Sequence, residues 1–326
     1  MSPIWPALWM DSSKFPRLLR SSPLWGESKG LSSVPKRSPL VWSGRGLSSG
    51  YNVIYRNVYA PKGHQLTAAS RAKAAWLWAR RDATVAGLSA AALHRTKWID
   101  ASLPAELIRI GDAAQGIVIH RDTLVDDEVC VIDGMAVTTP ARTAFDLGRR
   151  SRLEVAIIRL DALAYATRLQ RQHVDPLVER HRGARGIVQL RQAVDLMDGG
   201  AESPQETRTR LLLINAGFPR PKTQIIICNE YDEFVARIDM GWPEFRVGVQ
   251  YDGPQHWTDP DRHALDIDQQ AELQALDWRI IRVSRNLLRY RSSVFLGRTC
   301  QAMRAAGWPY CDDIRLDAQI SLDRVA

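Results

Sequence analysis

The stretch ARIDMGWPEFRVGVQYDGPQHW, residues 236–257, decides how the C-terminal part of the chain folds. Its centre, Val247-Gly248-Val249, is typical of a buried strand that runs on to Asp252. Because strand side chains alternate between two faces, Gln250 and Asp252 share one face. Asp239 ends the preceding predicted strand. Two adjacent strands can therefore bring Asp239, Gln250 and Asp252 to one end of a sheet.

The elements around this stretch follow the order helix–strand–strand–strand–helix–strand–helix, which predicts an α/β fold with a mixed sheet flanked by helices. Ser203-Pro204 predicts the start of the first helix, since serine caps helices and proline favours the first turn. Gly217 predicts its end. We expect helices at 204–215, 262–276 and 292–306, after one at 187–197, and strands at 223–229, 234–240, 245–252 and 278–284.

Residues 51–185 predict a smaller α+β domain that precedes the C-terminal domain, 186–326. Gly183 and Gly186 mark the predicted boundary, within a polar segment that starts at Val174. Residues 1–50 are rich in Ser, Pro and Gly without a sustained period, so we expect a disordered or atypical segment. In 51–170 we expect strands at 53–60, 105–111, 117–122 and 129–138, and helices at 67–80, 85–96, 139–147 and 153–169.

Composition and charge narrow the class of protein. The 326 residues are 45% hydrophobic and carry a net charge of +8, which suits a polyanionic partner such as DNA or, equally, an ordinary soluble surface. The net charge is +6 in residues 1–60 and +4 in residues 61–200, whereas residues 201–326 carry a net charge of −2. We see no run of about 18 apolar residues and no secretory signal, so we expect no membrane partner. The four cysteines form no CxxC pair, which favours a reducing cytoplasm.

The acids of the 236–257 stretch predict metal chemistry. A carboxylate next to a buried strand is costly unless it is paired or binds a metal. Hard oxygen ligands suit Mg²⁺ or Mn²⁺, which can activate water for attack on a phosphodiester. Each residue also has a plainer interpretation: Asp252-Gly253 as a turn, Asp239 as a loop acid, and His256 as a surface histidine.

The same run, with DIDQQAELQALDWRIIRVS after it, resembles the Vsr-like domain family of unknown function over about residues 200–300. That family is similar to very-short-patch-repair endonucleases in the PD-(D/E)xK superfamily. The resemblance implies a restriction-endonuclease-like fold that acts on DNA. It also implies Glu206 as the helix acid, Asp239 as the central metal ligand and His256 as a general base or phosphate contact. Arg282 matches the last strand of the family pattern.

This sequence departs from the family pattern in ways that bear on catalysis. Gln250 stands where the second acid is expected, and Asp252 stands where the superfamily usually has lysine. With Asp239, Asp252 and Gln250 as metal ligands, the site would bind Mg²⁺ or Mn²⁺ weakly. We expect the cationic side chains on and after the last strand to contact DNA phosphates: Arg282, Arg285 and Arg289.

Residues 51–170 resemble AbiEi-type antitoxin or transcriptional-regulator domains, on the texts YRNVYAPKG, AAWLWARRDATVAGLSAAALH and VTTPARTAFDLGRR. Such domains usually begin with a winged helix-turn-helix, and we expect it here to be either truncated or replaced by residues 1–50. The residues alone indicate only a small α/β domain, with a basic stretch around Trp76 and Trp78.

Three functions remain open from the sequence. The first is a metal-dependent DNA endonuclease or nickase that uses Glu206, Asp239, Gln250, Asp252 and His256. The second is a non-catalytic, DNA-binding antitoxin-type regulator with a degenerate nuclease fold. The third is an interaction protein whose domains bind a protein partner.

Overall fold

A computed structural model describes residues 32–33, 50–252 and 260–319. It divides the chain into two units, Met1–His64 and Gln65–Ala326. The described part of the first unit is an antiparallel sheet in the order β1-β3-β2, built from β1 (Ser32–Ser33), β2 (Tyr51–Tyr55) and β3 (Val58–Pro61). The prediction of one strand over 53–60 is wrong, because Asn57 takes a left-handed φ of 65° and reverses the chain. Most of the predicted segment 1–50 lies outside the described residues.

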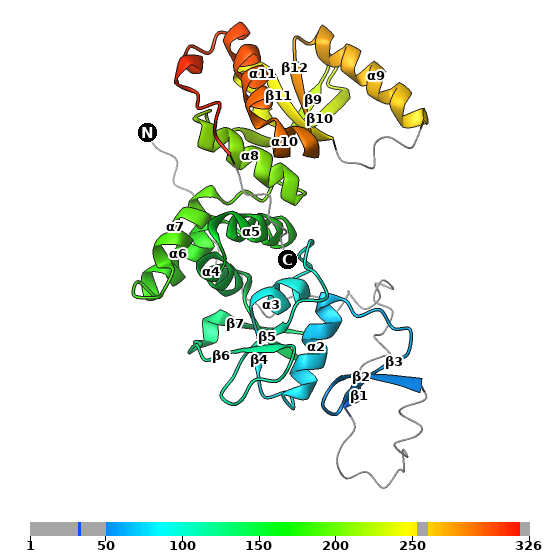
Figure 1. The fold of residues 1–326 in the computed structure, drawn as a ribbon, viewed down its shortest axis with the longest axis vertical. Helices are drawn as coiled ribbons and strands as arrows, with labels where there is room; N and C mark the ends of the chain where they lie inside the picture. The colour runs from blue at the N-terminus through cyan, green and yellow to red at the C-terminus, as the bar shows by residue number, and fades with distance from the viewer. Residues whose placement is uncertain (1–31, 34–49, 253–259, 320–326) are drawn as a thin grey trace, which may run out of the picture. The chain divides into compact units, whose positions relative to one another are not determined.

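The second unit begins with a mixed sheet of five strands in the order β6-β5-β4-β8-β7. β4 pairs antiparallel with β5 and parallel with β8, and β5 pairs parallel with β6. The helices α2 (Ala68–Trp78) and α3 (Gly87–Leu93) both contact β5 (Figure 1). The strands are β4 (Thr84–Val85), β5 (Ala105–Ile108), β6 (Ile117–His120), β7 (Val129–Ile132) and β8 (Met135–Thr138).

Two sequence predictions in this sheet are wrong for local reasons. The predicted strand 129–138 is a hairpin, because Asp133 and Gly134 take φ of 49° and 77°, as a tight turn between strands requires. The predicted helix 85–96 starts only at Gly87, because Val85 pairs with Val137 of β8. Sheet pairing overrides the helical propensity of this alanine-rich segment.

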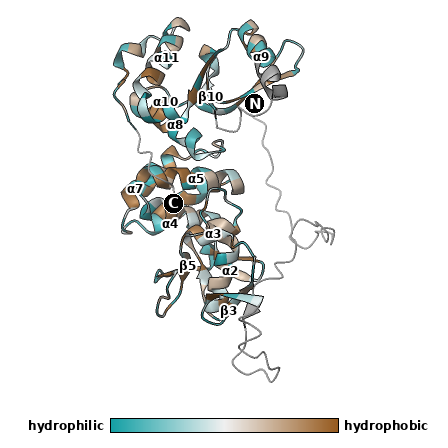
Figure 2. Cartoon of the chain, turned by 45° about the vertical axis from the view of Figure 1, so that its right-hand side comes forward, coloured by the Kyte–Doolittle hydropathy of each residue, from teal (hydrophilic) through white to brown (hydrophobic). Residues whose placement is uncertain are grey.

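A cluster of helices follows the sheet: α4 (Pro140–Arg150), α5 (Leu153–Thr167), α6 (Arg171–Arg180) and α7 (Ile187–Leu196). Thr139 caps α4 by accepting the Arg142 N–H, as predicted. The helices share one core, which includes Phe145, Leu163 and Leu190, and α5 is mostly hydrophobic in Figure 2. α6 lies in the segment predicted to be polar, since it turns only its apolar residues into this core. α7 packs on the same core, and the predicted boundary at 185/186 stays a prediction.

The C-terminal sheet has the order β12-β11-β10-β9 and is mixed, because β11 and β12 are parallel and the other pairs antiparallel. One face packs on α8 and α11 through residues such as Leu212, Val249 and Phe295. The other face packs on α9 through Ile238 and Leu273 (Figure 1). The α/β prediction and its element order are confirmed, with α10 as an addition. The elements are α8 (Pro204–Ala216), β9 (Lys222–Cys228), β10 (Phe234–Trp242), β11 (Val247–Asp252), α9 (Pro260–Ala275), β12 (Arg279–Ser284), α10 (Arg285–Tyr290) and α11 (Ser292–Ala305).

Helix α8 is covered from two sides. Leu211 joins the core of the helices α4–α7, whereas Leu212 and Leu213 join the core of the C-terminal sheet. The polar residues of the same helix, from Glu206 to Arg210, are also buried. A helix without a solvent-facing side shows little amphipathic periodicity, and its polar residues need partners inside the protein.

Candidate functional site

The start of α8 holds Glu206. Ser203 caps the helix by accepting the Glu206 N–H at 3.2 Å, and its hydroxyl donates to Glu206 Oε1 at 2.7 Å. The Glu202 N–H donates to Glu206 Oε2 at 2.9 Å. The predicted cap is therefore present, and these bonds fix a carboxylate that is only 9% exposed.

Asp239 lies where β10 and β11 stop pairing. Their ladder joins Met240 to Val249 and Trp242 to Val247. Beyond it, the Tyr251 N–H donates to Asp239 Oδ2 at 2.7 Å. The side chain of Asp239 thus accepts a hydrogen bond that a strand carbonyl would otherwise accept, and this holds the carboxylate at the end of the ladder.

Glu206 and Asp239 belong to one negatively charged neighbourhood. Burial raises the pKa of Glu206, and the charge of Asp239 raises it further. Burial also raises the pKa of Asp239; the Tyr251 N–H and Arg237 lower it, and the charges of Glu202 and Asp252 raise it. The repulsion among these groups is therefore not fully offset, although Arg237 pairs with Glu202 at 2.9 Å.

Asp252 and Gln250 lie nearby on β11 with different partners. Arg282 of β12 pairs with Asp252, with Nη2 2.9 Å from Oδ1. Gln250 is the register partner of Arg282, and both line a cavity of about 30 Å³ with Gln269 and Gln270 of α9. The charge of Asp252 is thus balanced by Arg282.

Gln224 of β9 is a member of the site that the sequence analysis missed. It takes a left-handed φ of 51°, and its Nε2 donates to Glu206 Oε2 at 3.5 Å. Its Oε1 is buried and has no hydrogen-bond partner among the described residues. No residue pattern distinguishes Gln224 from other strand glutamines, so only the structure identifies it.

The remaining predicted residues lie in different places. His256 lies outside the described residues. Arg285 and Arg289 are exposed on α10, and the Arg289 guanidinium lies 5.3 Å from the centre of the Tyr290 ring. Arg282 is engaged with Asp252, so its charge already has a carboxylate partner.

The oxygen donors can be compared with the needs of Mg²⁺. Glu206, Asp239 and the unpartnered Gln224 oxygen are the hard donors that such an ion prefers. Within residues 50–252 and 260–319, no three Asp, Glu, His or Cys side chains are grouped so as to hold a metal ion. The predicted metal roles of Asp239, Asp252 and Gln250 stay predictions.

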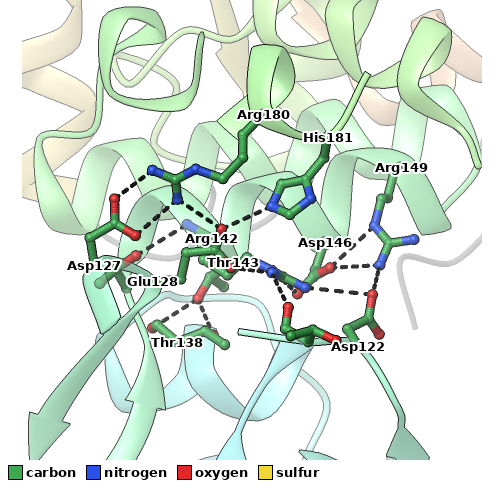
Figure 3. A network of polar contacts seen from close by, with 12 residues as sticks. Asp122, Asp127, Glu128, Thr138, Arg142, Thr143, Asp146, Arg149, Arg180 and His181 are labelled. Atoms are coloured by element: carbon green, nitrogen blue, oxygen red, sulfur yellow. Dashed lines mark hydrogen bonds and ion pairs between the residues drawn. The ribbon is translucent and has the colours of Figure 1, made fainter. Parts of the chain in front are cut away.

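A second polar cluster lies in the sheet-and-helix region before α8, and Figure 3 shows it. Arg142 of α4 is buried and pairs with Glu128, and its Nε lies 3.1 Å from Asp146 Oδ2. Glu128 also accepts from Arg180 and His181 at the end of α6, at 3.1 and 2.9 Å. The network joins α4 and α6 to the turn before β7.

This network extends along α4. Asp122 pairs with Arg149 and with Arg150, whose Nη2 lies 2.7 Å from Asp122 Oδ2. Asp146 also contacts both arginines, each at 3.0 Å. Burial opposes ionisation of Asp122, but Arg150 and Arg149 hold its pKa below the ordinary value. Because each cation faces an acid, we interpret the network as structural.

The network of Figure 3 lies within residues whose sequence matches a known protein family. Residues 66–196 match the family described as the AbiEi antitoxin C-terminal domain. We call these residues the matched region. It contains α2 to α7, the five-stranded sheet and the network of Figure 3. The predicted AbiEi resemblance is confirmed for these residues. No finding supports the Vsr-like resemblance of the C-terminal domain.

The chain is also similar to uncharacterized proteins from two strains of Mycobacterium tuberculosis. Each is 32% identical over 166 residues, which is 51% of this chain and 60% of the relative. The chain thus spans less than two thirds of the length of these relatives. No solved structure matches it. In the described part of the chain, no helix combines the length and hydrophobicity that a membrane span requires.

Proposed function

We propose that this protein is an antitoxin-type regulator that binds DNA and needs no nuclease reaction to act. The observation that carries the proposal is the match of residues 66–196 to the AbiEi antitoxin C-terminal domain. The C-terminal sheet supports it, because Asp252 is neutralised by Arg282 and Gln250 replaces the second acid of the Vsr-like pattern. The net charge of +8 suits a DNA partner.

The test is a binding assay with the full chain. Fluorescence anisotropy compares duplexes tiled over the DNA upstream of the protein's own coding region with unrelated duplexes of equal length. A regulator prefers some of the tiles by about 10³-fold or more at physiological salt. Equal affinity for all duplexes would contradict regulation by sequence-specific binding, and no binding at all would leave a protein partner as the better interpretation.

A metal-dependent nuclease is the second candidate, and the Glu206–Asp239 pair favours it. Burial and the charge of Asp239 raise the pKa of Glu206, burial raises the pKa of the half-buried Asp239, and a bound cation would offset these effects. Glu206, Asp239 and Gln224 would hold the ion, which would supply charge neutralisation at a phosphodiester. The Tyr251 N–H would keep Asp239 oriented. The predicted role of His256 as a base remains part of this proposal.

A plasmid assay separates the two candidates. Supercoiled plasmid is incubated with Mg²⁺ or Mn²⁺ and either the wild type or Asp239→Ala. We expect no metal-dependent nicking by either protein. Nicking by the wild type that disappears in Asp239→Ala would establish the nuclease instead. Nicking gained only in Gln250→Glu would show that the site lacks a single carboxylate.

A further inference from the structure

Four arginines gather at one end of the five-stranded sheet. Arg109 follows the last residue of β5 and Arg121 follows the last residue of β6, and these parallel strands end in register. The Arg109 N–H donates to the His120 carbonyl at 3.1 Å. β4 runs antiparallel to β5, with Thr84 opposite Ile108. The loop that carries Arg80 and Arg81 therefore enters the sheet at this same end.

Tryptophan rings orient two of these arginines. The Arg81 guanidinium lies 5.6 Å from the centre of the Trp76 ring, and the Arg109 guanidinium lies 5.6 Å from the centre of the Trp78 ring. Both rings belong to α2. Stacking on an aromatic face restricts the side chain and leaves the edge of the guanidinium free to donate to an anion.

The backbone also holds Arg80 and Arg81 in an unusual conformation. Both take left-handed φ values, 57° and 66°, which residues with a Cβ seldom adopt. Two hydrogen bonds close the turn, from the Arg80 N–H to the Leu77 carbonyl and from the Arg81 N–H to the Trp76 carbonyl. The turn ends α2 and presents both arginines, which are exposed, just beyond it.

These four arginines have no acid partner among the described residues, unlike the arginines of the network in Figure 3. Within residues 50–252 and 260–319, no carboxylate pairs with Arg80, Arg81, Arg109 or Arg121. Asp82 and Asp112 are exposed nearby in the chain but form no ion pair with them. By contrast, Arg142 and its neighbours in Figure 3 each face a carboxylate. The charge at this end of the sheet is therefore available to a ligand.

We propose that Arg80, Arg81, Arg109 and Arg121 form a surface that binds the phosphate backbone of duplex DNA. This inference rests on the proposed DNA-binding function and names the part of the matched region that contacts the partner. Guanidinium groups suit phosphate because their planar fork donates two parallel hydrogen bonds. The surface gives affinity rather than sequence preference, since phosphates carry no sequence information directly.

The test compares two double variants of the full chain by fluorescence anisotropy with a labelled duplex, over a series of KCl concentrations. Arg80→Ala with Arg121→Ala removes two charges from the surface and leaves both tryptophan-stacked arginines in place. Arg185→Ala with Arg191→Ala removes two exposed arginines elsewhere in the matched region and is the matched control. Circular dichroism shows that each variant is folded.

We expect the first variant to bind at least about tenfold more weakly at 0.1 M KCl, and the slope of log K against log[KCl] to fall by about 2. The control should keep at least half of the wild-type affinity. Equal losses in both variants, or no loss in the first, would overturn the surface while wild-type binding still supports the proposed function. Absence of wild-type binding would reject the proposed function itself. If poly-L-glutamate displaces the labelled duplex as effectively as unlabelled DNA of matched charge does, an acidic protein partner is favoured and the proposal is also overturned.

Discussion

Replacing Asp161 by Asn tests how the matched region is joined to α8. Asp161 lies in α5 and is 1% exposed. Its Oδ2 accepts from Arg210 Nη2 and from the Thr207 hydroxyl, each at 2.8 Å, and its Oδ1 accepts the Asp198 N–H at 2.7 Å. Arg210 is fully buried in α8 and has no other carboxylate partner among the described residues. This ion pair connects the two cores that meet at α8.

The expected loss follows from the geometry. In Asp161→Asn the side-chain amide can accept at only one oxygen, so its NH₂ group faces either the Asp198 N–H or the Arg210 and Thr207 donors. Arg210 then carries a buried charge without a counter-ion. Breaking one side of a buried pair costs about 3–5 kcal/mol in the free energy of unfolding. For a unit of this size, that corresponds to a fall in Tm of roughly 6–20 °C.

The assay is differential scanning calorimetry, supported by urea unfolding followed at 222 nm. Asp195→Asn is the control, because Asp195 pairs with Arg171 at 2.6 Å on the surface, where both side chains are more than half exposed. That exposed pair contributes about 0–1 kcal/mol. Adding Arg210→Met to Asp161→Asn should recover part of the loss, because it removes the unpaired charge. A Tm of Asp161→Asn within 2 °C of the wild type would refute the reasoning.

Three further predictions follow from the structure. The pKa of Glu128 lies below its ordinary value of 4.5 because His181 and Arg142 offset the effect of burial. The stabilisation from its carboxylate is therefore present above about pH 4.5 and is lost as the pH falls through the lowered value. Thermal melts between pH 7 and 3 should show a smaller acid-induced fall in Tm for Glu128→Gln than for the wild type, and parallel curves of Tm against pH would contradict this. The pKa of Asp239 is raised, chiefly by burial, so the stabilisation from its protonated form is present below pH 3.8 and is lost as the pH rises through the raised value. Asp239→Asn should therefore raise the Tm at pH 7.5 and abolish any rise in Tm that Mn²⁺ causes. A lower Tm of the variant would count against an uncompensated charge. Gly241→Ala should lower the free energy of unfolding by about 1–3 kcal/mol, because a Cβ would lie 2.3 Å from the Val247 carbonyl oxygen. Gly297→Ala lies inside α11 with open space around it and should raise the free energy of unfolding by about 0.5–1 kcal/mol. Urea midpoints that move in the same direction for both variants would refute the contrast.

Local signals predicted much of the fold. The Ser203-Pro204 cap, the alternation in β11 and the order of elements in the C-terminal domain depend on contacts within a few residues, and the structure has them. The same kind of reasoning failed at Asn57 and Asp133. There, one or two residues with left-handed φ turn an apparently continuous strand into a hairpin. Backbone reversals of this kind depend on one or two φ angles, which the hydrophobic pattern does not record.

For the candidate site, the sequence by itself predicted that Asp239, Gln250 and Asp252 meet at one end of a sheet, because adjacent strands constrain them; Glu206 was added only by the family resemblance. Only the tertiary structure decided their charge balance. The ion pair of Asp252 with Arg282 and the hydrogen bond from Tyr251 to Asp239 join residues on different strands, and the burial of the Gln224 oxygen depends on the packing around β9. The sequence likewise identified the basic stretch around Trp76 and Trp78 but not that Arg109 and Arg121 lie beside it. Ion pairing and burial depend on distances across the fold, and those distances are set by packing rather than by spacing along the chain.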